Sequence, residues 1–209
     1  MKRIQVGEAA SKIIASRLDV KTWLGQVPEV DAVRPATCPS CGRAGCVPGK
    51  RKEIVGHGLR ERQQRGPLVA GGAPQLVTIL VRRYACGCGA ILLVVPSETI
   101  ARRLYTVSAV AWAMALFGVE RASPAEVRRR TSPWAIVGAA AASGWATLRR
   151  WVSAIRMGEL LPKVRRSPSD FTDRQVAERV ATTMAALAPI SLASSEMAAR
   201  AFAGAKRSV

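Results

Sequence analysis

Apolar and polar positions divide the chain into a part that favours strands and a part that favours helices. Short apolar runs rich in β-branched residues predict three strands, at 54–60, 76–84 and 91–95. Residues 62–75 contain three glycines and two prolines, so we expect an exposed loop there. Before the strands, apolar residues at helical spacing predict a helix over about 9–24.

After Pro96 the pattern changes to that of helices. An apolar run predicts a helix over about 106–119. Ser123-Pro-Ala-Glu126 has the residues of a capped helix start, with a hydroxyl acceptor, a proline at the first helical position and a glutamate three residues after the cap. The short helix that follows is basic at 127–130 and ends at Ser132-Pro133. An Ala-rich helix over 134–142 and a turn at Ser143-Gly144 are expected next, before a further helix that begins at Trp145.

The helix that begins at Trp145 has two distinct sides. At the helical repeat of about 100° per residue, its large apolar side chains fall within an arc of about 120°. They are Trp145, Leu148, Trp151, Val152 and Ile155. The opposite side carries small and guanidinium side chains, namely Ala146, Arg149, Arg150 and Ser153. Such a helix suits the major groove of DNA, where arginine donates hydrogen bonds to guanine or to phosphate. The alternative is an ordinary amphipathic helix with solvated arginines.

The C-terminal residues have a different character. Thr172 and Gln175 form a predicted capping box for a helix with an apolar stripe, and Pro189 ends this helix. The stripe consists of Val176, Val180, Met184 and Leu187. A second Ala-rich helix is expected over about 194–205. Because residues 169–209 carry a net charge of only +1, we expect this hairpin to pack on the preceding helices. The alternative is contact with a second copy of the chain or with another protein.

The chain of 209 residues carries a net charge of +18 and has a pI near 11.2, which favours a polyanionic partner. The charge is concentrated in the middle, because 32–96 and 97–168 each carry +8 while the two ends carry +1 each. Basic clusters flank the helix that begins at Trp145, and they are Arg128, Arg129, Arg130, Lys163, Arg165 and Arg166. The predicted partner is therefore double-stranded DNA. We expect Arg149 and Arg150 to approach bases or phosphates and the flanking clusters to neutralise the backbone.

Two close pairs of cysteines give the clearest indication of chemistry, Cys38-Pro-Ser-Cys41 and Cys86-Gly-Cys88-Gly. Two such turns, separated by strand-like sequence, can bring four thiolates to one tetrahedral Zn²⁺, which stabilises a small fold with little core. The predicted ligands are Cys38, Cys41, Cys86 and Cys88, with zinc in a structural role. The second pair is one residue shorter than usual, so Cys46 and His57 remain alternative ligands. The N-terminus lacks an apolar signal core, which argues against a disulfide and favours a reducing cytoplasm.

The composition argues against several other classes of protein. His57 is the single histidine, and neither a set of metal-binding carboxylates nor a phosphate-binding loop accompanies it, so we expect no enzymatic activity. The most apolar windows, 105–119 and 134–148, are shorter than the roughly 20 residues that span a bilayer. No association with a membrane is expected, and the expected location is the cytoplasm, in contact with the nucleoid.

Several short motifs occur in an order that resembles a known family. They are Cys38-Pro-Ser-Cys41-Gly42, Gly56-His57-Gly58 with Arg60, Arg83-Tyr84-Ala85-Cys86-Gly87-Cys88-Gly89, Arg102-Arg103-Leu104-Tyr105 and Thr147-Leu148-Arg149-Arg150-Trp151. Over about 35–157 the chain is similar to the N-terminal regions of bacterial insertion-sequence transposases, and to short stand-alone relatives that carry a zinc ribbon and a helix-turn-helix. The resemblance implies binding of element-end DNA, and it makes a transposase an alternative partner of the C-terminal helices. The shortened second cysteine pair and the long interval between the Ser123 and Trp145 helices depart from the family pattern.

These observations predict an α+β fold, in which a small antiparallel β zinc ribbon precedes an all-α bundle that resembles a helix-turn-helix. Four segments are expected: an N-terminal helix with its lead-in at 1–34, the ribbon at 35–97, the helix-turn-helix-like domain at 98–160, and a basic linker with a helical hairpin at 161–209. The predicted function is that of a non-enzymatic, zinc-containing DNA-binding protein from a mobile element or in transcriptional regulation. An RNA-binding zinc-ribbon protein and an adaptor for a separate catalytic subunit are the alternatives.

Overall fold

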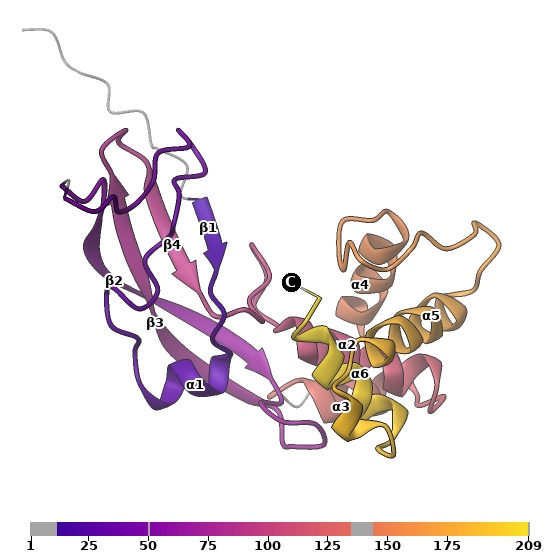
Figure 1. The fold of residues 1–209 in the computed structure, drawn as a ribbon. Helices are drawn as coiled ribbons and strands as arrows, with labels where there is room; N and C mark the ends of the chain where they lie inside the picture. The colour runs from indigo at the N-terminus through magenta and orange to yellow at the C-terminus, as the bar shows by residue number, and fades with distance from the viewer. Residues whose placement is uncertain (1–11, 50, 135–143, 209) are drawn as a thin grey trace, which may run out of the picture. The chain divides into compact units, whose positions relative to one another are not determined.

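The computed structural model describes residues 12–49, 51–134 and 144–208 of the chain (Figure 1). The chain divides into two compact units. The first contains residues up to Arg62 together with Thr78–Ser97, and the second contains Gln63–Val77 together with the residues from Glu98 onward. Each unit has its own core, and each holds one of the two predicted sites.

A four-stranded sheet organises the first unit (Figure 1). Its strands are β1 (Lys12–Ala15), β2 (Ile54–Gly66), β3 (Gln75–Cys86) and β4 (Ile91–Val95), in the order β1-β4-β3-β2. β3 and β4 are antiparallel, with Arg82 opposite Val94, whereas β1 runs parallel to β4. The sheet is therefore mixed, and the prediction of a purely antiparallel sheet was wrong because it left β1 out.

Among the residues that the structure describes, the predicted helix over 9–24 is confirmed only for 20–24. Residues 12–15 form β1, and the helix α1 covers only Val20–Gly25. The pair Ile13-Ile14 is β-branched, which lowers helix propensity and favours a strand. Asp19 then starts α1, because its carboxylate accepts the N–H of Thr22 at 2.8 Å as an N-cap. The apolar positions that suggested one helix belong to two elements.

The hairpin formed by β2 and β3 is longer than predicted, because 62–66 and 75 of the expected loop belong to the strands, and 67–74 form the connection. The end of β2 is held inside the second unit. Arg65 donates its N–H to the carbonyl of Leu104 at 2.8 Å. Gly66 has φ +115°, and a Cβ there would lie 2.4 Å from the Cβ of Ala109. Tertiary contacts therefore fix the end of β2 at a position that only glycine can occupy.

The second unit is a helical bundle with α2 at its centre (Figure 1). Its elements are α2 (Val107–Gly118), α3 (Pro124–Thr131), α4 (Ala146–Arg156), α5 (Asp173–Ala186), a 3-10 turn η2 (Ile190–Leu192) and α6 (Met197–Ala205). Eleven of the twelve residues of α2 are buried, and α2 packs against α3, α5 and α6. A Cβ at Gly118 would lie 2.3 Å from the backbone nitrogen of Glu178, so a glycine is required for α5 to approach this closely.

The predicted helices in this unit are confirmed wherever the structure describes them. Ser123 caps α3 by accepting the N–H of Glu126 at 3.2 Å, and Thr172 and Gln175 form the predicted capping box at the start of α5. The predicted helix over 134–142 lies, apart from Trp134, outside the described residues. α5 and α6 pack on α2 within the chain, as expected for the C-terminal hairpin. None of the described helices is both long enough and apolar enough to cross a membrane.

Candidate metal centre and nucleic-acid interface

The first cysteine turn is closed by two backbone hydrogen bonds. The N–H of Cys38 donates to the carbonyl of Arg43 at 2.9 Å, and the N–H of Gly42 donates to the carbonyl of Cys38 at 2.8 Å. Gly42 has φ +72°, in the left-handed region that glycine adopts without strain. The chain therefore reverses between Cys38 and Arg43, and this reversal explains the glycine directly after Cys41.

The second cysteine turn repeats this construction with one residue fewer. The N–H of Cys86 donates to the carbonyl of Ala90 at 2.9 Å, and the N–H of Gly89 donates to the carbonyl of Cys86 at 2.8 Å. Gly89 has φ +87° and corresponds to Gly42 of the first turn. Equivalent hydrogen bonds close both turns. The thiols of Cys86 and Cys88 can therefore point to the same side of their turn despite the shorter spacing.

Four sulfur atoms meet between the two turns. They belong to Cys38, Cys41, Cys86 and Cys88, and all lie within 4.8 Å of one another. The Sγ atoms of Cys38 and Cys88 are 3.8 Å apart, and those of Cys41 and Cys86 are 3.7 Å apart. A tetrahedral ion bound at about 2.3 Å from each sulfur requires sulfur–sulfur distances of about 3.8 Å, whereas a disulfide requires about 2.05 Å. The group consists of free thiols and has the dimensions of a metal site.

The four thiols differ in exposure and in acidity. Cys38 and Cys86 are buried, whereas Cys41 and Cys88 are exposed. Burial raises the pKa of Cys38, but the backbone N–H groups of Ser40 and Cys41 and the neighbouring thiols lower it, to about 6 overall. The N–H of Cys88 lowers the pKa of Cys86, but burial and the other thiols raise it to about 12. Ionisation of one thiol thus disfavours ionisation of its neighbours, and a bound cation would remove this repulsion between thiolates.

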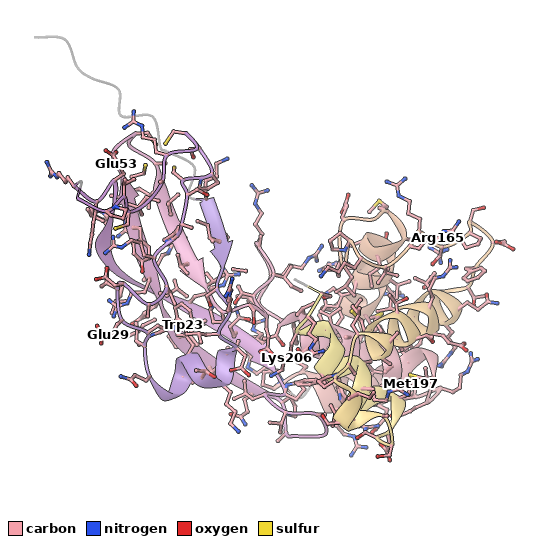
Figure 2. All side chains as sticks on the ribbon, in the orientation of Figure 1. Trp23, Glu29, Glu53, Arg165, Met197 and Lys206 are labelled. Atoms are coloured by element: carbon pink, nitrogen blue, oxygen red, sulfur yellow. The ribbon has the colours of Figure 1, made fainter. Side chains whose placement is uncertain are left out.

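Glu53 lies directly before β2 and contacts both cysteine turns. Its carbonyl accepts the N–H of Gly87 at 3.0 Å, and its carboxylate pairs with Arg43 at 3.3 Å. Figure 2 shows Glu53 close to sulfur atoms at one end of the sheet. A Cβ at Gly87 would lie 2.8 Å from the Glu53 carboxylate, so a larger residue there would displace this side chain. Nothing in the sequence around Glu53 had indicated this role.

Three hydrogen bonds attach the lead-in to the first turn across β3. Trp23, labelled in Figure 2, donates its indole N–H to the carbonyl of Leu80 at 2.8 Å. Arg82 donates to the carbonyl of Pro28 at 2.7 Å, and the hydroxyl of Tyr84 donates to the carbonyl of Val30 at 2.6 Å. The segment before Cys38 is therefore fixed against the strand that ends at Cys86. These partners are more than fifty positions apart, so no local signal in the sequence could have found them.

The alternative ligands lie outside the sulfur group. Cys46 is an exposed free thiol, and His57 lies on an exposed stretch of β2. Neither belongs to the group of residues that could hold a metal ion within the part of the chain that the structure describes. The candidate metal centre thus consists of the four cysteines that the two sequence motifs contain.

The predicted two-sided helix is α4, and its sides are arranged as predicted. All five predicted apolar residues are buried, and Ala146, Arg149, Arg150 and Ser153 are exposed. The rings of Trp145 and Trp151 meet edge to face with centroids 5.1 Å apart, and Tyr105 lies 4.9 Å from Trp151 in the same manner. The contribution of Tyr105 was not foreseen, because it lies just before α2 and far from α4 in sequence.

The predicted basic residues differ in how their charges are compensated. On α3, Arg129 pairs with Glu126, and Arg130 pairs with Glu120 at 2.8 Å. Arg128 is half-buried, and its Nε has no hydrogen-bond partner. Among the described residues, Arg149 and Arg150 form no ion pair, so their charges are the least compensated on the exposed side of α4.

The loop after α4 carries the second basic cluster. Lys163 donates to the carbonyl of Arg207 at 2.9 Å, and Arg165 and Arg166 are exposed. Figure 2 labels Arg165 at the surface of this loop. The carbonyl of Arg166 accepts a hydrogen bond from Arg179 of α5 at 3.2 Å, which attaches the loop to the bundle.

α3 and α4 both belong to the predicted helix-turn-helix-like domain, and they pack against different neighbours. α3 packs on α2, and α4 packs on α5. Residues 132–145 separate them, and 135–143 are outside the described part of the chain. The described structure therefore shows that α4 has an exposed basic side and a buried side that packs through aromatic rings. It does not identify the helix that would complete the motif.

Comparison with known proteins adds no further constraint on these two sites. The chain matches no protein-family model, no curated protein and no solved structure.

Proposed function

We propose that this protein is a non-enzymatic, zinc-containing protein that binds double-stranded DNA through α4. The observation that carries the proposal is the exposure of Arg149 and Arg150 on a helix whose opposite side is anchored by Trp145 and Trp151. An α-helix with a rigid base fits the major groove, and arginine there can donate two hydrogen bonds to guanine. The net charge of +18 supports a polyanionic partner.

Zinc is the proposed occupant of the sulfur group. Four thiolates at tetrahedral spacing favour zinc or an iron centre over harder ions such as magnesium and calcium. The four cysteines would fill all four positions of a tetrahedral ion, which is typical of structural sites, whereas catalytic sites keep one position open. The role proposed for the ion is to join the residues around Cys38 to the β3–β4 turn, so that the small sheet is stable.

The other basic residues serve a different purpose in this proposal. Arg165 and Arg166 lie on the loop after α4 and neutralise phosphates without reading bases. Arg128, Arg129 and Arg130 are assigned the same role, although Glu126 and Glu120 compensate two of these charges. The resemblance to transposase N-terminal regions suggests a process in a mobile element or in transcriptional regulation, in the cytoplasm and on the nucleoid.

Duplex binding measured by fluorescence anisotropy over a salt series tests the proposal. We expect affinity for a labelled duplex library whose logarithm falls steeply with the logarithm of salt concentration, and weaker binding to single-stranded RNA of equal length. Arg149→Ala with Arg150→Ala should reduce duplex affinity by about 100-fold, on the basis of about 1–3 kcal/mol for each contact. Arg149→Lys with Arg150→Lys keeps the charge and should restore non-specific binding but not sequence preference.

The matched control is Arg17→Ala with Lys21→Ala, which removes two exposed cations from the first unit. This control should change the duplex affinity far less than the α4 pair. Equal losses of duplex affinity in both double variants would show that only the net charge matters, and would contradict a specific role for α4. Preference for the RNA over the duplex would favour the RNA-binding alternative.

A further inference from the structure

A cavity of about 430 Å³ lies in the second unit where three helices begin. It is lined by the first residues of α3, by the N-terminal half of α4 and by Asp173 at the start of α5. Phe117, Trp145, Leu148 and Val152 form apolar walls. The volume is in the range of small-molecule sites, and apolar walls with few polar groups are typical of such sites.

The polar groups around this cavity favour an anion. Arg149 lines it and forms no ion pair among the described residues. Asp173, the acid in the lining, is already bound by Arg156 at 3.0 Å. The excess charge at the cavity is therefore the positive charge of Arg149.

The N-terminus of α4 adds to this positive potential, whereas the N-terminus of α3 is capped by Ser123 and carries Glu126 in its first turn. Pro124 and Ala125 begin α3, and Gly144 and Trp145 precede the first turn of α4; all four line the cavity. The N-cap of α4, Trp145, makes no side-chain hydrogen bond to the first turn, so the N–H groups of that turn lack a side-chain acceptor. Helix N-termini carry partial positive charge and attract anions. Apolar walls, an arginine and the uncapped start of α4 thus converge on one space.

We propose that this cavity binds a small amphipathic anion, with an apolar or aromatic body against Trp145 and Phe117 and a carboxylate or sulfonate on Arg149. The second part of the proposal rests on the proposed function. Because Arg149 is also assigned to DNA, the bound anion neutralises a DNA-contacting cation and weakens duplex binding. The cavity then makes the basic helix responsive to a metabolite with this chemistry.

Two fluorescent probes that differ in charge test the cavity directly. The anionic probe is 8-anilinonaphthalene-1-sulfonate, and N-phenyl-1-naphthylamine is the same aromatic body without the sulfonate. We expect the full-length protein to bind one equivalent of the anion, about tenfold more tightly than the neutral probe, as one charge-assisted contact implies. Arg149→Met should remove this difference, because the sulfonate loses its cation and the two probes then bind with similar affinity.

A blocking variant checks that the probes bind in this cavity. Ala125→Trp places a large ring in the lining at an exposed position of α3, so it should abolish binding of both probes without disturbing the core. Ala186→Trp introduces the same ring at the exposed end of α5, outside the lining, and should leave binding unchanged. Probe binding that survives Ala125→Trp, or equal affinity for the two probes, overturns the proposal.

The link to DNA is measured separately. A saturating concentration of the sulfonate should reduce duplex affinity on the order of tenfold in the parent and not in Ala125→Trp. If the parent binds no duplex, the proposed function fails, while the difference between the two probes still decides whether the cavity takes anions. If duplex affinity is the same with and without the sulfonate, the regulatory part is wrong.

Discussion

The sulfur atoms of Cys38 and Cys88 lie 3.8 Å apart although fifty positions separate the two residues in the chain. Cys38 begins the first turn and is buried, whereas Cys88 lies on the exposed side of the second turn. A tetrahedral ion would thus have one side toward the sheet and one toward solvent. An ion in this position would close the long loop between the two turns. A cross-link lowers the entropy of the unfolded chain most when the loop that it closes is long.

Replacement of an exposed ligand tests the metal centre with little effect on packing. Cys88→Ser should lower bound zinc from one equivalent to well below half an equivalent after dialysis, because the hydroxyl is a poor substitute for a thiolate. Metal content measured by atomic emission checks this. Cys46→Ser, at the exposed cysteine outside the group, is the control and should retain one equivalent. Loss of zinc in the control would return Cys46 to the ligand set.

Removal of the metal should affect the two units unequally. All five cysteines belong to the first unit, whereas the core of the second consists of helices without cysteine. Structural zinc contributes on the order of 10 kcal/mol to small metal-binding domains, so a strong chelator should expose the amides of β4 and of both cysteine turns. Hydrogen exchange followed by mass spectrometry should detect this change while α2 remains protected. Equal loss of protection in α2 would contradict independent cores.

Gly204 is a site where one methyl group should destabilise the helical bundle. A Cβ there would lie 1.8 Å from the carbonyl oxygen of Met184, so Gly204→Ala forces α6 away from α5. We expect a loss of about 3 kcal/mol in the free energy of unfolding, at the upper end for overpacking. Denaturant unfolding followed by circular dichroism checks this. Gly25→Ala, with no atom within 4 Å of the added methyl, should cost less than about 0.5 kcal/mol.

The buried carboxylate of Glu98 depends on Lys206. The two side chains pair at 2.9 Å, and Ser108 also donates to Glu98 at 3.2 Å. Lys206→Met leaves the carboxylate without its cation and should cost about 3 kcal/mol of stability. The double variant Glu98→Gln with Lys206→Met should recover most of this loss, which a double-mutant cycle measures. A double variant as unstable as Lys206→Met would show that the lysine acts through packing instead.

Phosphate contacts and base contacts should respond differently to mutation. Arg165→Ala should weaken binding to all duplexes alike and reduce the slope of log affinity against log salt by about 1. Arg150→Ala should instead reduce the difference between the preferred duplex and a scrambled one, by about 10-fold or more. Competition binding with both duplexes at two salt concentrations measures these effects. If the two variants behave identically, the division of roles between α4 and the following loop is wrong.

Features carried by neighbouring residues were predictable from the sequence. The caps at Ser123 and Thr172 depend on a side chain that reaches an N–H three residues later, and both are present. The buried and exposed sides of α4 follow from the helical repeat alone. The two cysteine turns are likewise local, because each is closed by hydrogen bonds that span no more than five residues. In each case a few consecutive residues contain the whole interaction.

Features that join distant residues were not predictable, because their energy comes from partners that only the folded chain brings together. Ile13 and Ile14 suited a helical stripe equally well, and pairing with β4 made them a strand. The position of Glu53 depends on its hydrogen bond with Gly87, and Glu98 pairs with Lys206, which lies directly after α6. The cavity beside Arg149 arises where three helices begin together. Short motifs in the sequence thus identify the groups that carry the chemistry of this chain. Their assembly into sites depends on long-range packing, because its energy comes from residues that are far apart in the chain.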